Sequence, residues 1–129
     1  MVADEIFETT NDNNNTVTMD MRTSEEKTAL SPPELILSAL AGCAAVDIVG
    51  MLKKRRKSIL EFVIETDGTR KDETPRYFTR IHCLYTITSP DVTEEELHKS
   101  AALALEKYCS VASSLKAEIT YSVKVTRSK

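Results

Sequence analysis

Residues 31–57 read SPPELILSALAGCAAVDIVGMLKKRRK, and they predict the long helix around which the rest of the chain is organised. Ser31 is a favoured N-cap residue, Pro32 is tolerated in a first turn, and Glu34 completes a Ser-x-x-Glu capping box. The basic residues at positions 53–57 suit the carbonyl end of the helix dipole. Between these ends almost every side chain is apolar, so the helix has no polar face to turn toward water.

A helix that is apolar on every side belongs either in a membrane or in the centre of a soluble core. The run from Leu35 to Leu52, followed by basic residues, is long enough to cross a membrane. Asp47 lies inside this run, however, and an ionised carboxylate at mid-helix costs about 2.5–3.5 kcal/mol. Many of the other residues are alanines, which makes the run only mildly hydrophobic. We therefore predict a buried central helix and no membrane partner.

The composition is that of one domain covering residues 1–129. The 17 basic and 20 acidic side chains give a net charge of −3, which offers no general attraction for nucleic acid or anionic lipid. Residues 1–10 show no basic region followed by an apolar run, so we expect a cytoplasmic protein. The three cysteines form no CxxC motif, and in a reducing compartment this favours thiols with separate roles.

The segments on either side of the long helix alternate as strands do. We expect strands at residues 5–10, 16–21, 59–66 and 76–89, an Asn-rich turn at 11–15, a loop at 22–30 and a hairpin connection at 67–75 that begins with Asp67-Gly68. In the strand at 76–89 one face is expected to carry Tyr77, Thr79, Ile81, Cys83, Tyr85 and Ile87, and the other begins with Phe78.

The last third of the chain predicts two helices and a final strand. Thr93 and Glu96 form a second capping box, which begins a helix that runs to about Tyr108. A short helix at 110–115 and a strand at 117–126 follow. The order β-β-α-β-β-α-α-β predicts an α+β fold with the long helix packed on a sheet. Because one small sheet cannot cover a helix that is apolar all round, we expect an intertwined homodimer.

The cysteines are the main candidates for chemistry, although a free cysteine usually packs as a small hydrophobic residue. That structural interpretation fits Cys83, which alternates with apolar neighbours in a strand, and it stays open for the other two. Cys43 follows Gly42 among alanines, where the backbone leaves room for a small substrate or a second thiol. Cys109 lies near a helix start, where amide donors and the dipole lower the pKa of a thiol.

Other kinds of site have little support in the sequence. His82 and His98 have no ligand spacing to a cysteine, so we expect no metal site. A chain with three glycines has no glycine-rich phosphate loop, and no Ser/His/Asp arrangement is indicated. The basic cluster at 53–57 is interpreted mainly as solvation of the helix end.

Two stretches, SPPELILSALAGCAAVD (31–47) and KYCSVASSLKAEITYSVKV (107–125), resemble the OsmC/Ohr family of thiol-dependent organic hydroperoxide reductases. The most specific parts are the Pro-x-x-Leu run ahead of the alanine-rich helix with Cys43, and Lys-Tyr-Cys-Ser-Val-x-x-x-Leu around Cys109. The resemblance implies an OsmC-like α+β fold in a strand-swapped dimer, with the long helices buried and the active sites at the subunit interface.

The resemblance also implies a reaction. Cys43 looks like the peroxidatic cysteine, whose thiolate attacks the O–O bond of an alkyl or fatty-acid hydroperoxide and becomes a sulfenic acid. Cys109 looks like the resolving thiol, which condenses with that sulfenic acid to a disulfide. A lipoyl-type or thioredoxin-like dithiol protein would then reduce the disulfide, and no bound cofactor is implied. Arg22 matches the family arginine that stabilises the thiolate and the developing oxyanion.

One departure from the family pattern concerns the carboxylate that holds this arginine. It comes ten residues before the peroxidatic cysteine, where this chain has Pro33. Either the adjacent Glu34 turns in from the first helical turn, or Arg22 is held differently. Without that carboxylate, and with Asp47 one turn beyond Cys43, we expect a raised pKa for this thiol.

Two functions therefore stay open. The first is a Cys-based peroxidase that reduces organic hydroperoxides in defence against oxidative stress. The second is a non-catalytic OsmC-like dimer that binds an apolar ligand or senses redox state.

Overall fold

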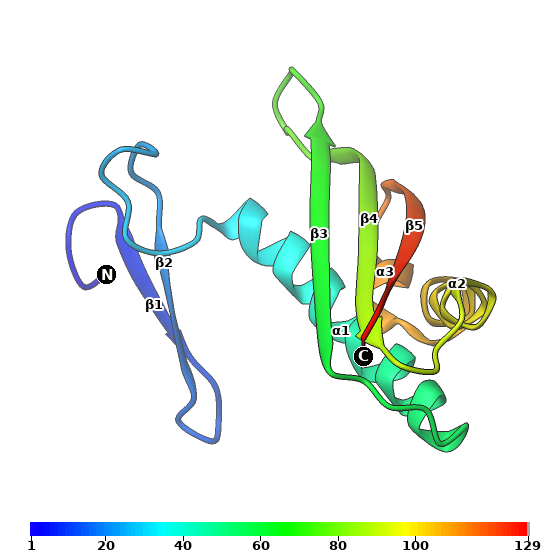
Figure 1. The fold of residues 1–129 in the computed structure, drawn as a ribbon. Coiled ribbons are helices and arrows are strands. Elements are labelled where there is room, and N and C mark those ends of the chain that lie inside the picture. Colours follow the sequence, from blue (N-terminus) through cyan, green and yellow to red (C-terminus); the bar gives the residue numbers. More distant parts are fainter. Residues whose placement is uncertain (129) are drawn as a thin grey trace. The chain divides into compact units, whose positions relative to one another are not determined.

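The structure, a computed structural model, describes residues 1–128 and has the predicted α+β element order (Figure 1). Contacts within the chain divide it into two compact units, Met1–Ile36 and the segment from Leu37 onward. Each unit is described here by itself. The assignment of residues 1–129 to one domain stays a prediction.

The N-terminal unit contains an antiparallel hairpin, β1 (Ile6–Thr10) and β2 (Thr16–Asp20). Both strands were predicted, with ends that differ by one residue. The connecting turn is built as its composition suggests, because the side-chain oxygen of Asn11 accepts hydrogen bonds from the amides of Asn13 and Asn15 at 3.0 and 2.9 Å. A loop leads from this hairpin to the long helix.

The long helix, α1, spans Pro32–Lys54. Its predicted capping box is confirmed: the Ser31 amide donates to Glu34 Oε1 at 3.0 Å, and the Glu34 amide donates to Ser31 Oγ at 3.4 Å. The helix ends within the basic cluster, and Arg56 adopts a positive φ of 60° just beyond it.

The chain covers only one stripe of α1, which consists of Leu40, Ala44, Ile48 and Leu52. Val46, on another side of the helix, is 73% exposed. By length and composition α1 could cross a membrane, but its spaced buried stripe packs on a sheet as a core helix does. The prediction that one sheet cannot cover α1 is therefore confirmed within the chain, whereas the second copy that would cover the rest stays a prediction.

The sheet of the second unit has three strands in the order β3-β4-β5 (Figure 1). They are β3 (Glu61–Arg70), β4 (Phe78–Ser89) and β5 (Glu118–Arg127). β3 and β4 are antiparallel, whereas β4 and β5 are parallel and need a crossover. The crossover consists of α2 (Glu94–Leu103), the π-helical turn η1 (Ala104–Tyr108) and the short helix α3 (Ser110–Ser114).

The predicted hairpin connection between β3 and β4 was wrong in position. Asp67 and Gly68 lie inside β3, paired with His82 and Ile81, and the strand continues to Arg70. Gly68 is needed for close packing and not for a turn, because a Cβ atom there would lie 2.5 Å from Cε1 of Phe78.

The predicted faces of β4 were also wrong at its start. A register shift between Thr69 and Arg70 places Phe78 on the buried side, while Tyr77 is 42% exposed and Thr79 is exposed. Such an irregularity breaks the alternation of side chains. From Ile81 onward the predicted alternation is confirmed.

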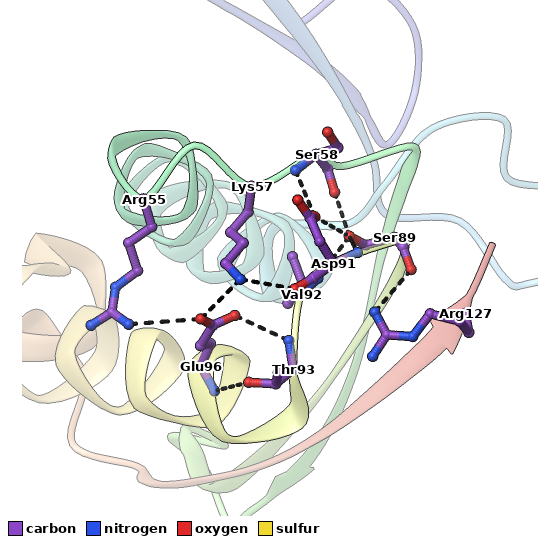
Figure 2. A network of polar contacts seen from close by, with 9 residues as sticks. All are labelled: Arg55, Lys57, Ser58, Ser89, Asp91, Val92, Thr93, Glu96 and Arg127. Carbon is purple, nitrogen blue, oxygen red and sulfur yellow. Dashed lines mark hydrogen bonds and ion pairs between the residues drawn. The ribbon is translucent and has the colours of Figure 1, made fainter. Parts of the chain in front are cut away.

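A network of polar contacts joins the end of α1, the end of β4 and the start of α2 (Figure 2). The buried Ser89 hydroxyl donates to the carbonyl of Ser58 and accepts from the amides of Asp91 and Val92 at 3.1 and 3.0 Å. Lys57 Nζ lies 3.2 Å from an oxygen of Glu96, which also belongs to the confirmed capping box of α2 (Figure 2). These bonds fix both connections at this end of the sheet.

Candidate functional site

The fold of the second unit brings Cys43 and Cys109 together. Cys43 lies in the middle of α1, and its thiol is near enough to the Cys109 thiol for each to shift the pKa of the other. Cys109 lies at the junction of η1 and α3, where its amide donates to the carbonyl of Ala104 at 2.7 Å. Cys43 is half-buried and Cys109 is 3% exposed, so one thiol of the pair is open to approach.

The environment of Cys43 favours its thiolate. The backbone amide of Val111 is the main cause of a lowered pKa, followed by the Cys109 thiol and, more weakly, the amide of Ser110. Burial and the charge of Asp47 act in the opposite direction. The expected raised pKa was therefore wrong: Asp47 has the expected sign, but the first-turn amides of α3 outweigh it.

The environment of Cys109 favours its neutral thiol. Burial is the main cause of its raised pKa, and the neighbouring Cys43 acts in the same direction, although the Ala112 amide donates to Cys109 Sγ at 3.3 Å. We expected the helix start to lower this pKa. The amides of Ala112 and Val111 do act in that direction, but burial outweighs them, so the expected net lowering was wrong. The lowered pKa of Cys43 suits a nucleophile, and the raised pKa of Cys109 suits a partner that carries a proton.

Cys83 is in the core, as its strand pattern predicts. It is fully buried on the inner face of β4, and burial raises the pKa of its thiol. Its neighbour on the same face is Tyr85.

Arg22 belongs to the N-terminal unit and is held there by Asp20. Arg22 Nη2 lies 2.7 Å from Asp20 Oδ2, and Arg22 Nε donates to Asp20 Oδ1 at 3.0 Å. Asp20 also accepts from the amides of Arg22 and Thr28, and the Arg22 side chain holds the pKa of this buried carboxyl well below its usual range. Sequence reasoning missed Asp20, although an aspartate at the end of a strand, two residues before the candidate arginine, was the available signal.

Glu34 is held by other partners in the same unit. It forms an ion pair with Lys27 and accepts from the amide and hydroxyl of Ser31, and these contacts lower its pKa to about 2, Lys27 most strongly. Of the two arrangements that the sequence left open, the structure therefore has Arg22 held differently, by Asp20. The roles of Arg22 and Glu34 in catalysis stay predictions, and these residues and the two cysteines belong to different units.

A cavity of about 360 Å³ borders α1 one turn beyond Cys43. Its lining consists of Val46, Asp47, Gly50, Met51, Lys54 and Tyr108. Asp47, Gly50 and Lys54 follow Cys43 at helical spacing, so they share its face of α1, and Tyr108 directly precedes Cys109. The cavity, which neither cysteine lines, can hold a small organic molecule one helical turn from Cys43. Within residues 1–128 no group of three or more ligating side chains is placed to hold a metal ion.

Comparisons with known proteins agree with this architecture. The family model described as "OsmC-like protein" matches residues 24–124. Protein YhfA of Escherichia coli (strain K12) is 36% identical over 99 residues, which cover 75% of this chain and 74% of YhfA. A hypothetical protein from Aquifex aeolicus VF5 is similar in structure, with a TM-score of 0.76 and 26% identity over the whole of both chains. An organic hydroperoxide resistance protein from Elizabethkingia anophelis shares the fold, with a TM-score of 0.65 and 14% identity over 95% of this chain and 94% of that chain.

Proposed function

This chain belongs to the OsmC-like protein family, and from that membership and its thiol pair we propose that it reduces organic hydroperoxides. Membership supports a function related to oxidative stress. Proteins named for organic hydroperoxide resistance share the fold. One observation carries the proposal: a half-buried Cys43 with a lowered pKa lies near a buried Cys109 with a raised pKa.

The first step is an attack by the Cys43 thiolate on the terminal oxygen of the hydroperoxide. The O–O bond breaks, the alkoxide takes up a proton and leaves as the alcohol, and Cys43 becomes a sulfenic acid. The amides of Val111 and Ser110 stabilise the attacking thiolate. Arg22 is our candidate for stabilising the developing oxyanion, with Asp20 in place of Glu34 as the carboxylate that holds it.

The second step joins the two thiols. Cys109 attacks the sulfenic sulfur of Cys43, a disulfide forms, and the hydroxyl group leaves as water with the Cys109 proton. An external dithiol then reduces the disulfide by thiol exchange and is itself oxidised. The nearness of the two thiols, which shift the pKa of one another, supports this step.

The cavity one helical turn from Cys43 supports the proposal of an organic substrate in preference to hydrogen peroxide. Val46 and Met51 offer apolar contacts to an alkyl group, which hydrogen peroxide lacks. A second candidate function follows from the same cavity, because a non-catalytic relative could bind an apolar ligand there and use the thiols to sense redox state.

Peroxidase assays with thiol variants test the proposal. With dithiothreitol or dihydrolipoamide as reductant, we expect the protein to consume cumene hydroperoxide, Cys43→Ser to abolish this turnover, and Cys83→Ser to keep it. After one equivalent of peroxide, peptide mass spectrometry should find a Cys43–Cys109 disulfide. Absent turnover with both thiols still free would reject the peroxidase and favour the ligand-binding protein.

A further inference from the structure

One end of the three-stranded sheet carries an exposed tyrosine that two lysines contact. Tyr77 directly precedes β4 and is 42% exposed. Lys71 Nζ lies 5.7 Å from the centroid of the Tyr77 ring, and Lys116 Nζ lies 5.1 Å from it. An ammonium group at such a distance is attracted to the aromatic ring, so the two lysines help to fix the side chain. Tyr77 is therefore an ordered aromatic group on the surface.

The two lysines belong to different connections, which the sheet topology brings to the same end. Lys71 follows β3, and Lys116 precedes β5. Because β4 is antiparallel to β3 and parallel to β5, the end of β3 lies beside the starts of β4 and β5 (Figure 1). The Lys71 amide donates to the Tyr77 carbonyl at 2.9 Å, and Arg76 Nε donates to the Lys71 carbonyl at 3.3 Å. These bonds fix the connection that presents Tyr77.

The segments that meet at Tyr77 are rich in basic side chains. Residues 70–80 and 116–118 contain five cationic residues, Arg70, Lys71, Arg76, Arg80 and Lys116, which together with Tyr77 we call the basic patch. The ion pairs among residues 1–128 involve other cations, namely Arg22, Lys27, Arg55 and Lys57. The basic patch therefore presents positive charge that no carboxylate of the described chain neutralises by direct pairing.

The basic patch lies near the segments that carry the two thiols. α3 separates Cys109 from Lys116, and their Cα atoms can be at most about 17 Å apart. At the start of β4, a Cβ atom on Gly68 would lie 2.5 Å from the Phe78 ring and 3.1 Å from Leu37 Cδ2. Leu37 precedes Cys43 by six residues, or about 9 Å along α1. A protein interface of ordinary size, about 800 Å² on each partner, can therefore cover the basic patch and reach the thiol pair.

We propose that the basic patch is the docking surface for the protein that supplies the external dithiol, and that this partner binds through an acidic surface. The inference rests on the proposed function and deepens it, because it assigns a surface to the partner that reduces the Cys43–Cys109 disulfide. Tyrosine and arginine are enriched where protein interfaces gain most of their binding energy. Cations without partners in the chain are available to a partner's carboxylates, and they also steer its approach.

The acidic residues of the same segments favour a protein partner over a nucleic acid. Asp72, Glu73 and Glu118 lie among the five cations. A nucleic acid carries a negative charge at every phosphate, so these carboxylates would repel it, and the net charge of −3 adds to the repulsion. A folded protein can instead place acidic groups opposite the cations and basic groups opposite the three carboxylates.

Docking places a dithiol at the disulfide. A thiolate of the partner attacks the Cys43 sulfur, which is the more exposed of the two, the S–S bond breaks, and its electron pair leaves with Cys109. The second thiol of the partner then attacks the mixed disulfide and releases Cys43. The partner ends as a disulfide, and its two protons pass to Cys109 and to Cys43 or solvent. A small dithiol follows the same steps without a docking surface.

Reduction kinetics test the basic patch. The Cys43–Cys109 disulfide is formed with diamide, and its reduction by reduced thioredoxin and by a reduced lipoyl domain is followed at low and at high salt. Arg80→Glu/Lys116→Glu reverses two exposed cations and should lower the second-order rate constant at low salt by about tenfold for at least one of these proteins. High salt should shrink the difference, because it screens exposed charges. Reduction by dithiothreitol should be unchanged.

The matched control is Lys99→Glu/Lys124→Glu, which makes the same change of net charge at exposed positions outside the basic patch. It should keep the rate constants close to those of the wild type, and both double variants should keep the wild-type melting temperature. If the control slows reduction as much as Arg80→Glu/Lys116→Glu does, or if neither variant slows it for either protein, the basic patch is not the docking surface.

A binding measurement does not depend on peroxidase activity. Fluorescence anisotropy of labelled thioredoxin, of a labelled lipoyl domain and of a short labelled single-stranded DNA is followed as the reduced protein is added. We expect one of the two proteins to bind, and Arg80→Glu/Lys116→Glu to weaken this binding by about tenfold, even if the wild type reduces no hydroperoxide. A peroxidase that binds neither protein, or binds only the DNA, would overturn the docking surface and leave the proposed function standing.

Discussion

At Cys43 the backbone has more influence than the side chains on which sequence reasoning depends. Asp47 is a full negative charge one turn away and raises the pKa of the thiol, yet the amide of Val111, with help from Cys109 and Ser110, reverses the net shift. First-turn amides of a helix have no partner within it, so they are free to donate to a thiolate. Any residue type other than proline supplies such an amide, which is why the sequence could not reveal the effect.

Ser110→Pro tests this backbone effect directly. Proline is tolerated at the first helical position, and the preceding Cys109 already has φ −76° and ψ 107°, which suits a residue before proline. The variant should therefore keep α3 and lose only the Ser110 amide, so the pKa of Cys43 should rise. At a pH below the pKa of Cys43, alkylation of this thiol by iodoacetamide should slow by roughly three- to tenfold, since one hydrogen bond to a charged group is lost.

The matched control for this variant is Ser110→Ala, which keeps the amide and removes the hydroxyl. Its alkylation profile should coincide with that of the wild type. If Ser110→Pro also leaves the profile unchanged, the Ser110 amide does not stabilise the thiolate.

At the scale of the elements, the capping residues were sufficient to predict where two helices begin, because a cap depends only on neighbouring residues. The Ser31–Glu34 and Thr93–Glu96 pairs each satisfy backbone donors within one turn, and both helices begin where these pairs predict. The end of β3 depends instead on a contact between strands. Asp67-Gly68 has the composition of a turn, but Gly68 is required because the ring of Phe78 lies against it.

Gly68→Ala should therefore destabilise the protein although it lies within a strand. The added Cβ would meet two ring atoms of Phe78 at 2.5 and 2.8 Å, and overpacking of this kind costs about 1–3 kcal/mol. Urea denaturation followed by circular dichroism gives the free energy of unfolding. If Gly68 were needed for a turn, adding Phe78→Leu to Gly68→Ala would recover none of the lost free energy of unfolding. We expect the double variant to recover part of it.

The same distinction explains which parts of the candidate site could be predicted. Cys43 and Cys109 were identified by motif, and the structure places them near enough to shift the pKa of one another. Asp20 was missed because its importance depends on burial and on a loop that brings the amide of Thr28 to its carboxylate. Tyr85 was predicted only to share a strand face with Ile81, Cys83 and Ile87, and the structure shows that it is fully buried.

At the scale of the whole molecule, α1 is more apolar than one chain can cover. A buried stripe of four residues packs on the sheet, while Val46 and other apolar side chains of the helix stay exposed. Burial of apolar surface contributes about 25 cal/mol per Å², so an uncovered face of this kind favours association. We propose that a second copy of the chain covers it, in the homodimer expected from the sequence.

Val46→Glu tests the homodimer, because it places a charge at an exposed apolar position in the middle of α1. Analytical ultracentrifugation should find a dimer for the wild type and a shift toward monomer, with at least a tenfold weaker association, for the variant, since burying an unpaired charge is strongly unfavourable. Lys99→Glu, which adds negative charge to an exposed position of α2, should leave the dimer intact. A wild-type protein that sediments as a monomer at micromolar concentration would mean that α1 is covered by something other than a second copy.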